Sequence, residues 1–178
     1  MAKNKFKLLS EKKLHTARVF TLHAETWRGP DGHEFHRQTI RHPGAVAILP
    51  FDAQGRLLLI RQFRPAVQEF LLEIPAGTLE KGEAPLGCAK RELIEETGFK
   101  AKTWKRLGEI YTAPGFCSEK IHIFEAHDLS PAFAEQDDDE HIDPPTALSM
   151  PLVRQAVKSG KICDAKTLSA LLQHSLYR

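Results

Sequence analysis

The most constraining feature of the chain is the segment from Gly77 to Phe99, which contains five glutamates. Four of them, Glu83, Glu92, Glu95 and Glu96, lie in or just before one short helix. This helix is predicted to begin near Pro85, whose fixed φ angle and missing N–H suit a first helical turn. It should end near Gly98, which can adopt the left-handed conformation that closes a helix. A loop and a capped helix of defined length are therefore expected near the middle of the chain.

Three glutamates of this helix are predicted to form one acidic cluster. Glu92 and Glu96 are four residues apart, so their carboxylates project from one face, and Glu95 lies at its edge. Like charges at this spacing cost about 0.2 to 0.5 kcal/mol per pair, and Arg91 alone cannot neutralise all three. Oxygen ligands without paired histidines or cysteines favour Mg²⁺ or Mn²⁺ over Zn²⁺. The cluster predicts metal-assisted attack of water on a phosphate ester or anhydride; the alternative is a solvated helix face.

The whole segment resembles the Nudix box, in which a glycine, five residues and a glutamate are followed seven residues later by R-E-L-I-E-E-T-G-F. One position matches the pattern less closely, because the last residue is usually aliphatic and is Phe99 here. The resemblance implies a Nudix fold and hydrolysis of a nucleoside diphosphate linked to another moiety. Glu83 and Arg91 are expected to brace the loop against the helix. The implied metal ligands are Glu92, Glu95, Glu96 and the carbonyl of Ala76, with Glu95 also a catalytic candidate.

Two further elements resemble one branch of that family, the ADP-ribose and nucleoside diphosphate sugar pyrophosphatases. The first is A-P-G-F-C-S-E at 113–119, whose proline follows Gly98 by sixteen residues; its Ser118 and Glu119 are candidates to bind sugar hydroxyls. The second is G-K-I-C-D-A-K-T at 160–167, which opens the last helix. Taken alone, they would be an ordinary turn and a capped helix. Together the resemblance covers nearly the whole chain.

The acidic run at 135–142, bounded by prolines, is the predicted position of the general base. A charge run of this kind is normally a solvated, mobile loop. Related pyrophosphatases carry an acidic loop here whose glutamate acts as a metal ligand or general base. Glu140 matches that position best, and Asp138 is the second candidate for the general base. A carboxylate there suits proton abstraction from the attacking water.

Substrate contacts outside the box are expected from one arginine and two aromatic residues. Arg64 matches an arginine that in the family reaches the diphosphate or terminal ribose, and its planar fork suits two phosphate oxygens; an edge-strand arginine in solvent is the alternative. Phe35 and Trp27 are candidates for stacking on the base, although burial at an interface explains them equally well.

The strand pattern predicts an N-terminal antiparallel pair at 17–24 and 34–40, closed by the turn at 29–32, and a second hairpin at 45–51 and 56–63. Further strands are expected at 71–74, 104–110 and 120–126, and helices at 151–159 and 165–176, the latter capped by Asp164. The expected fold class is α/β (α+β): a Nudix α/β/α sandwich with a mixed sheet at 44–178, preceded by a small antiparallel β unit at 1–43.

Charge and composition limit the partners and the location. The net charge of +2 gives no strong electrostatic reason for nucleic-acid binding, and no segment approaches the roughly 18 apolar residues that cross a bilayer. The lysine-rich start is not followed by the apolar core of a signal peptide. Three scattered cysteines fit reduced thiols. We expect a cytoplasmic protein, and a homodimer, since related enzymes pack the N-terminal unit against a partner subunit and a small exposed sheet is marginal alone.

The sequence as a whole predicts a Mg²⁺- or Mn²⁺-dependent hydrolase of ADP-ribose or a related nucleoside diphosphate sugar, with a nucleoside monophosphate and a sugar phosphate as products. One alternative substrate class is dinucleoside polyphosphates or nucleoside triphosphates, which the branch-specific elements argue against. The other alternative is a non-catalytic ADP-ribose-sensing module. Such modules often lose box acids, whereas all four are present here.

Overall fold

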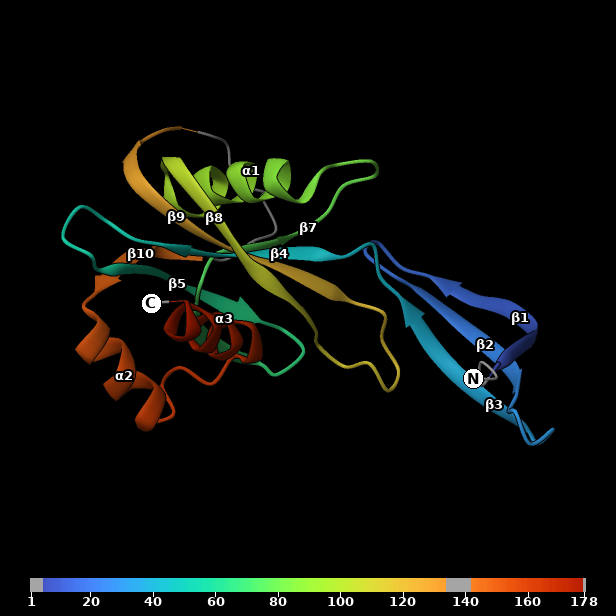
Figure 1. The fold of residues 1–178 in the computed structure, drawn as a ribbon. Helices are drawn as coiled ribbons and strands as arrows, with labels where there is room; N and C mark the ends of the chain where they lie inside the picture. Colours follow the sequence, from blue (N-terminus) through green and yellow to red (C-terminus); the bar gives the residue numbers. More distant parts are fainter. Residues whose placement is uncertain (1–4, 134–141, 178) are drawn as a thin grey trace. The chain divides into compact units, whose positions relative to one another are not determined.

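The computed structural model describes residues 5–133 and 142–177 of the chain (Figure 1). The chain divides into two compact units. The first contains Met1–Gly44 and Tyr111–Lys120, and the second contains Ala45–Ile110 and Ile121–Arg178. Among the helices in the described ranges, none is long and apolar enough to span a membrane.

The first unit contains a three-stranded antiparallel sheet, ordered β1 (Lys7–Thr16), β2 (Thr21–Arg28) and β3 (Glu34–Arg41). The predicted hairpin is confirmed, since β2 and β3 pair in register from Thr21 with Arg41 to Arg28 with Glu34. Its first strand was predicted too early and begins at Thr21. Strand β1 was not predicted because nearly all of its side chains are exposed, so it shows no alternation of apolar and polar residues.

The second unit contains two sheets and three helices. Its four-stranded sheet has the order β7-β4-β9-β8, with β4 parallel to β9 and antiparallel to β7. Its three-stranded sheet has the order β10-β5-β6. The strands are β4 (Ala45–Pro50), β5 (Leu57–Arg64), β6 (Glu69–Glu73), β7 (Ala76–Thr78), β8 (Phe99–Tyr111), β9 (Lys120–Pro131) and β10 (Ile142–Leu148); the helices are α1 (Pro85–Thr97), α2 (Met150–Lys158) and α3 (Ala165–Leu176).

The predicted strands at 45–51 and 56–63 are present, and the turn between them is closed by a hydrogen bond from the N–H of Asp52 to the carbonyl of Arg56 at 3.0 Å and by an isolated antiparallel bridge between Phe51 and Leu57. The predicted pairing is wrong beyond that bridge, because β4 and β5 belong to different sheets. All six residues of β4 are buried, as expected for a strand with a parallel neighbour and covered faces. A continuous apolar run shows that a strand is buried but carries no information about which strand pairs with it.

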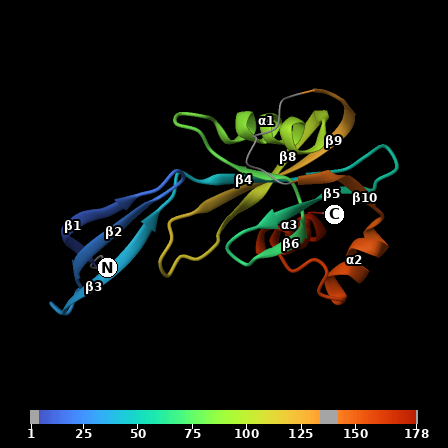
Figure 2. The same cartoon turned by 180° about the vertical axis from the view of Figure 1, so that it is seen from behind.

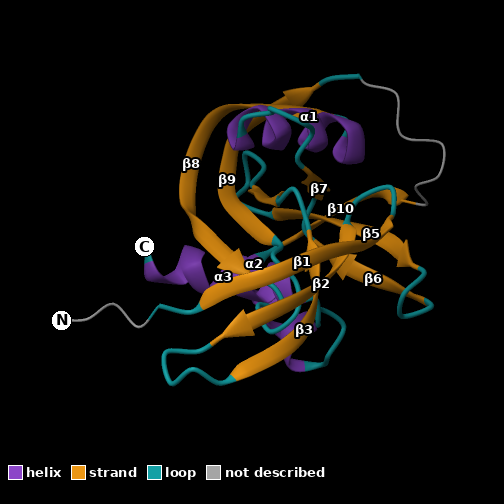
Figure 3. Ribbon diagram, turned by 90° about the vertical axis from the view of Figure 1, so that its right-hand side faces the viewer, coloured by secondary structure: helices purple, strands orange, loops and turns teal. Residues whose placement is uncertain are grey.

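The two faces of β4 pack into separate hydrophobic clusters, which makes this unit a layered α/β structure. Val46 and Ile48 pack into the cluster that contains Cys88, Ala89 and Leu93 of α1. The alternate residues of β4 pack into the cluster that contains residues of α2 and α3, namely Val153, Ala156 and Ala170. Helix α1 therefore lies on one side of the strands and α2 and α3 on the other (Figures 2 and 3). The predicted α/β/α layering is present.

Candidate active site

Helix α1 has the bounds that its sequence predicts. It starts at Pro85 and is closed by Gly98, whose φ is 71° and whose N–H donates to the carbonyl of Ile94 at 2.8 Å. Leu86 in its first turn is 38% exposed. Its buried face includes two of the three acids, because that face consists of Cys88, Ala89, Glu92, Leu93, Glu96 and Thr97.

Glu92 lies directly against the backbone of β7 at Gly77. A Cβ atom placed on Gly77 would lie 1.9 Å from the carboxyl carbon of Glu92, so any larger residue would clash with this carboxylate. The glycine that opens the box is therefore required for space. It lets the acidic helix approach the strand closely enough for carboxylate and backbone to meet.

Glu96 contacts the same strand one residue earlier. Its Oε2 accepts a hydrogen bond from the backbone N–H of Ala76 at 2.8 Å, and the glutamate is only 2% exposed. Ala76 and Glu96 were both predicted as metal ligands from the resemblance, and the structure brings them together. Glu92 and Glu96 thus lie against consecutive residues of β7 from one face of α1.

Arg91 links the remaining acids of the box. Its Nη1 donates to Glu92 at 2.7 Å and to Glu95 at 2.8 Å, while Nε and Nη2 donate to the two oxygens of Glu83 at 3.1 Å each. The hydrogen bond from Arg91 holds the pKa of Glu83 below its ordinary value, and the same contact raises the pKa of Arg91. The predicted brace between loop and helix, Glu83 with Arg91, is present.

The donor set of this site fits a hard divalent cation. No group of three acidic, histidine or cysteine side chains within residues 5–133 and 142–177 is already arranged as a metal cage. However, three carboxylates share a single guanidinium, so the cluster of Glu83, Glu92, Glu95 and Arg91 keeps an excess of negative charge. Carboxylate oxygens are among the ligands that Mg²⁺ and Mn²⁺ prefer.

Arg64 makes a forked ion pair that was not predicted. Its Nε and Nη2 each donate to a carboxylate oxygen of Glu73 at 2.8 Å, and Glu73 is fully buried. Lys166 also donates to Glu73 and lies 3.1 Å from Asp164, so two cations meet two carboxylates in one cluster. No local sequence signal predicts this cluster, because the partners of Glu73 come from other segments of the chain. The side chain of Arg64 is 35% exposed.

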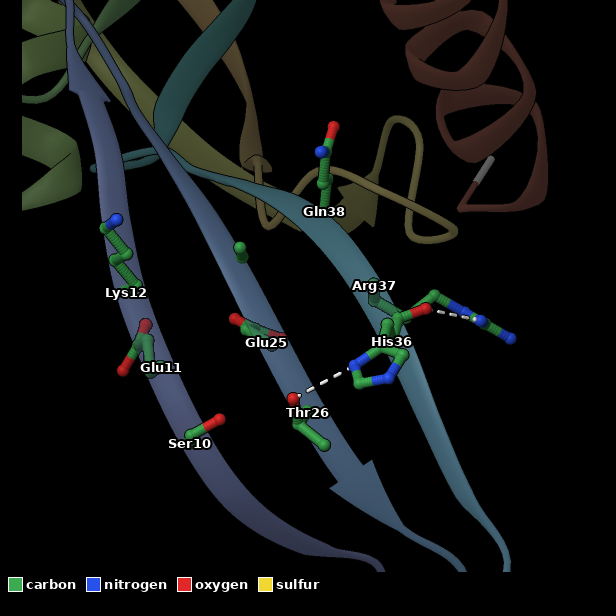
Figure 4. A pocket seen from close by; sticks show the side chains of 9 residues that line it. Ser10, Glu11, Lys12, Glu25, Thr26, His36, Arg37 and Gln38 are labelled. Carbon is green, nitrogen blue, oxygen red and sulfur yellow. Dashed lines mark hydrogen bonds between the residues drawn. The ribbon is translucent and has the colours of Figure 1, made fainter.

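The predicted base-stacking residues lie on the sheet of the first unit. Trp27 and Phe35 face each other across β2 and β3, and Trp27 donates its indole N–H to the buried carboxylate of Glu25 at 2.8 Å. The guanidinium carbon of Arg37 lies 4.8 Å from the centre of the Phe35 ring. A pocket of about 420 Å³ on this sheet is lined by residues of all three strands, including Glu25 and Arg37 (Figure 4).

The predicted sugar-binding residues also belong to the first unit. The hydroxyl oxygen of Ser118 accepts from the backbone N–H of His42 at 3.0 Å, and Glu119 accepts from the Thr112 hydroxyl at 2.7 Å. Both side chains are therefore held in a defined loop conformation. The predicted general bases Glu140 and Asp138 lie outside the described residues.

Comparisons with known proteins agree with this geometry. The NUDIX domain matches residues 41–160. An ADP-ribose pyrophosphatase of Bacillus subtilis is 36% identical over 93% of this chain and 90% of its own length. A methanol dehydrogenase activator of Bacillus methanolicus is 36% identical over 93% and 92%. The crystal structure of an ADP compounds hydrolase superposes with a TM-score of 0.87 at 25% identity, covering 99% of this chain and 96% of the other. The chain belongs to the NUDIX domain family.

Proposed function

We propose that the protein hydrolyses the pyrophosphate bond of ADP-ribose or a related nucleoside diphosphate sugar, releasing a nucleoside monophosphate and a sugar phosphate. The observation that carries this proposal is the meeting of Glu92 and Glu96 with the backbone of Gly77 and Ala76. The Bacillus subtilis relative named an ADP-ribose pyrophosphatase supports the substrate class, because it aligns over nearly the whole of both chains.

The cofactor in this proposal is Mg²⁺ or Mn²⁺, held by Glu92, Glu95, Glu96 and the carbonyl of Ala76. When bound, such an ion offsets charge that develops on the pyrophosphate and activates the water nucleophile. The chain itself orients the carboxylates. Arg91 fixes Glu92 and Glu95, and the N–H of Ala76 fixes Glu96.

Further substrate contacts are proposed for residues outside the box. Arg64 has a partly exposed side chain whose guanidinium is of a kind that suits phosphate oxygens, and its pairing with Glu73 fixes the plane of that group. Ser118 and Glu119 are proposed to bind sugar hydroxyls, and Trp27 or Phe35 to stack on the base. Glu140 is proposed as the general base or a further metal ligand, on the resemblance alone.

The decisive experiment is a substrate panel assayed with Mg²⁺ and with Mn²⁺, with products identified. It would contain ADP-ribose, sugar nucleotides, dinucleoside polyphosphates and nucleoside triphosphates. We expect nucleoside diphosphate sugars to be cleaved fastest, to a monophosphate and a sugar phosphate. Preferred hydrolysis of triphosphates or dinucleotides would reject the proposed substrate class. Reaction in ¹⁸O-labelled water would locate the phosphorus that is attacked.

Glu96→Gln tests the role of the acidic helix. Turnover should fall roughly 100- to 1,000-fold, the effect typical of losing a group that stabilises transition-state charge. Glu80→Gln is the matched control, since Glu80 lies in the same segment with an exposed side chain and should keep full activity. Normal turnover of the Glu96 variant would remove this residue from the metal site.

A second candidate function is favoured by the Bacillus methanolicus relative, whose name describes an activator of another enzyme. A chain of that kind could bind ADP-ribose and regulate a partner without turnover. Calorimetric titration with ADP-ribose beside the product assay separates the two functions. Tight binding without product would favour the sensor, whereas product formation that needs Glu96 favours the hydrolase.

We also propose that the protein is a cytoplasmic homodimer in which residues 1–43 serve dimerisation and substrate contacts and residues 44–178 form the catalytic domain. Exposed aromatic side chains in the first unit, Phe6 at 59% and Phe116 at 57%, support a further interface there. All three cysteines are free thiols, which suits a reducing compartment. Light scattering coupled to gel filtration of the full chain should give twice the 20.0 kDa chain mass. A monomer at catalytic concentrations would refute the dimer.

A further inference from the structure

The first turn of α3 holds the strand segment that leads into the candidate active site. Asp164 caps this helix, accepting from the backbone N–H of Thr167 at 2.9 Å and from its hydroxyl at 2.7 Å. Lys166 lies between the carboxylates of Asp164 and Glu73. All of these side chains are buried or nearly so, with Lys166 only 11% exposed.

Thr167 is bound to the backbone of the next residue of that segment. Its hydroxyl oxygen accepts from the N–H of Ile74 at 3.0 Å, and both residues are completely buried. Two successive residues, Glu73 through its side chain and Ile74 through its backbone, are therefore attached to α3. Neither contact reaches the acidic helix α1 directly.

The segment has little freedom between this attachment and the candidate metal site. Pro75 follows, with its φ angle fixed by the ring, and its carbonyl accepts from the N–H of Ile48 in the central strand β4 at 2.9 Å. Ala76 comes next, and its N–H donates to Glu96. Only the conformationally restricted Pro75 separates Ile74 from Ala76. A displacement of Ile74 would therefore also move Ala76 and its hydrogen bond to Glu96.

We propose that Lys166 and Thr167 are positioning residues, which set the backbone at Ala76, and with it the carboxylate of Glu96, for cation binding. The inference rests on the proposed metal-dependent function. It gives the D-x-K-T element a role beyond helix capping. Lys166 and the Thr167 hydroxyl both contact Asp164, and each also contacts the strand segment, through Glu73 and through the N–H of Ile74 respectively. Buried ion pairs are weak contributors to net stability but can fix one arrangement of the chain.

The test measures Mn²⁺ binding to the full chain in the absence of substrate. The electron paramagnetic resonance signal of the free ion reports how much Mn²⁺ remains unbound. Thr167→Val keeps the side-chain shape and the backbone cap, but it loses the acceptor for Ile74 and the hydroxyl donor to Asp164. Lys166→Met keeps the apolar stem and loses the charge. We expect each to weaken Mn²⁺ binding about 10- to 100-fold, the usual effect of losing a residue that orients metal ligands. Thr167→Ser, which retains the hydroxyl, should restore the wild-type affinity.

Two controls separate positioning from general damage. Ser175→Ala removes a hydroxyl that bonds to Leu172 within the same helix, and it should leave Mn²⁺ affinity unchanged. Hydrogen exchange of the Ala76 amide should accelerate in Thr167→Val relative to amides of β4, because its bond to Glu96 is less well held. If Thr167→Val does not fold, Lys166→Met and Thr167→Ser carry the comparison.

The outcomes distinguish this inference from the proposed function. Folded variants whose Mn²⁺ affinity and Ala76 exchange both match the wild type would overturn the positioning role while leaving the hydrolase intact. A wild-type protein that neither binds Mn²⁺ nor cleaves any nucleotide in the panel would overturn both. Weakened binding in both variants, with rescue by serine, supports the positioning role.

Discussion

Two charged clusters in the second unit are built from the same types of charged residue but differ in net charge. Around Arg91, one cation is shared by the carboxylates of Glu83, Glu92 and Glu95. Around Glu73, two carboxylates meet two cations, and the central glutamate is fully buried. The balanced cluster can remain in a dry interior because its charges are paired. The acidic cluster, which is partly exposed, is suited to receive an additional cation.

The largest effect on stability is expected from breaking the balanced cluster. Glu73→Gln leaves Arg64 and Lys166 without their buried partner and should lower the unfolding free energy by about 3 kcal/mol. Glu83→Gln in the acidic cluster should cost about 1 kcal/mol or less, because that pair is partly solvated. Urea unfolding at neutral pH without metal measures both. Equal losses would contradict the contrast between the clusters.

A smaller loss is expected where the acidic helix touches the strand. Gly77→Ala places a methyl group on the Glu92 carboxylate and should lower stability by about 2 kcal/mol, as overpacking does. Gly115→Ala is the matched control, since a Cβ there meets nothing within 4 Å and the φ angle is ordinary. Thermal unfolding compares them. If Gly77→Ala is as stable as Gly115→Ala, the close approach of helix and strand is wrong.

The smallest effect concerns pH. Burial acts to raise the pKa of Asp164, but the charge of Lys166 and the hydrogen bonds from Thr167 outweigh it and hold the pKa below the ordinary value of 3.8. This carboxylate therefore adds stability that is complete above pH 3.8 and is lost as the pH falls through its lower folded value. Asp164→Asn, which still caps a helix, should be about 1 kcal/mol less stable at pH 7, with the gap closing in acid. A constant gap in urea unfolding from pH 7 to pH 2 would exclude the charge effect.

Local signals allowed much of the second unit to be predicted. Proline and glycine set the two ends of α1, and Asp164 set the start of α3, because caps depend on neighbouring residues alone. The spacing of the box also placed Glu92 and Glu96 on one helix face, which the structure turns toward β7.

Features that depend on distant partners could not be predicted in the same way. The apolar run of β4 gave no sign that its neighbours are β7 and β9. Glu73 looked like an ordinary strand residue, because its two cationic partners come from β5 and α3. The exposed strand β1 lacked any periodic apolar pattern.

The parallel pairing of β4 with β9 has a consequence for how the chain is made. β4 leaves the ribosome early, but its parallel partner follows only after the whole acidic helix and strand β8 have been synthesised. Until then the apolar edge of β4 is open, and α1 has only part of the surface on which it packs. A nascent chain stalled before Lys120 would expose that edge to chaperones and to other unfinished copies of itself.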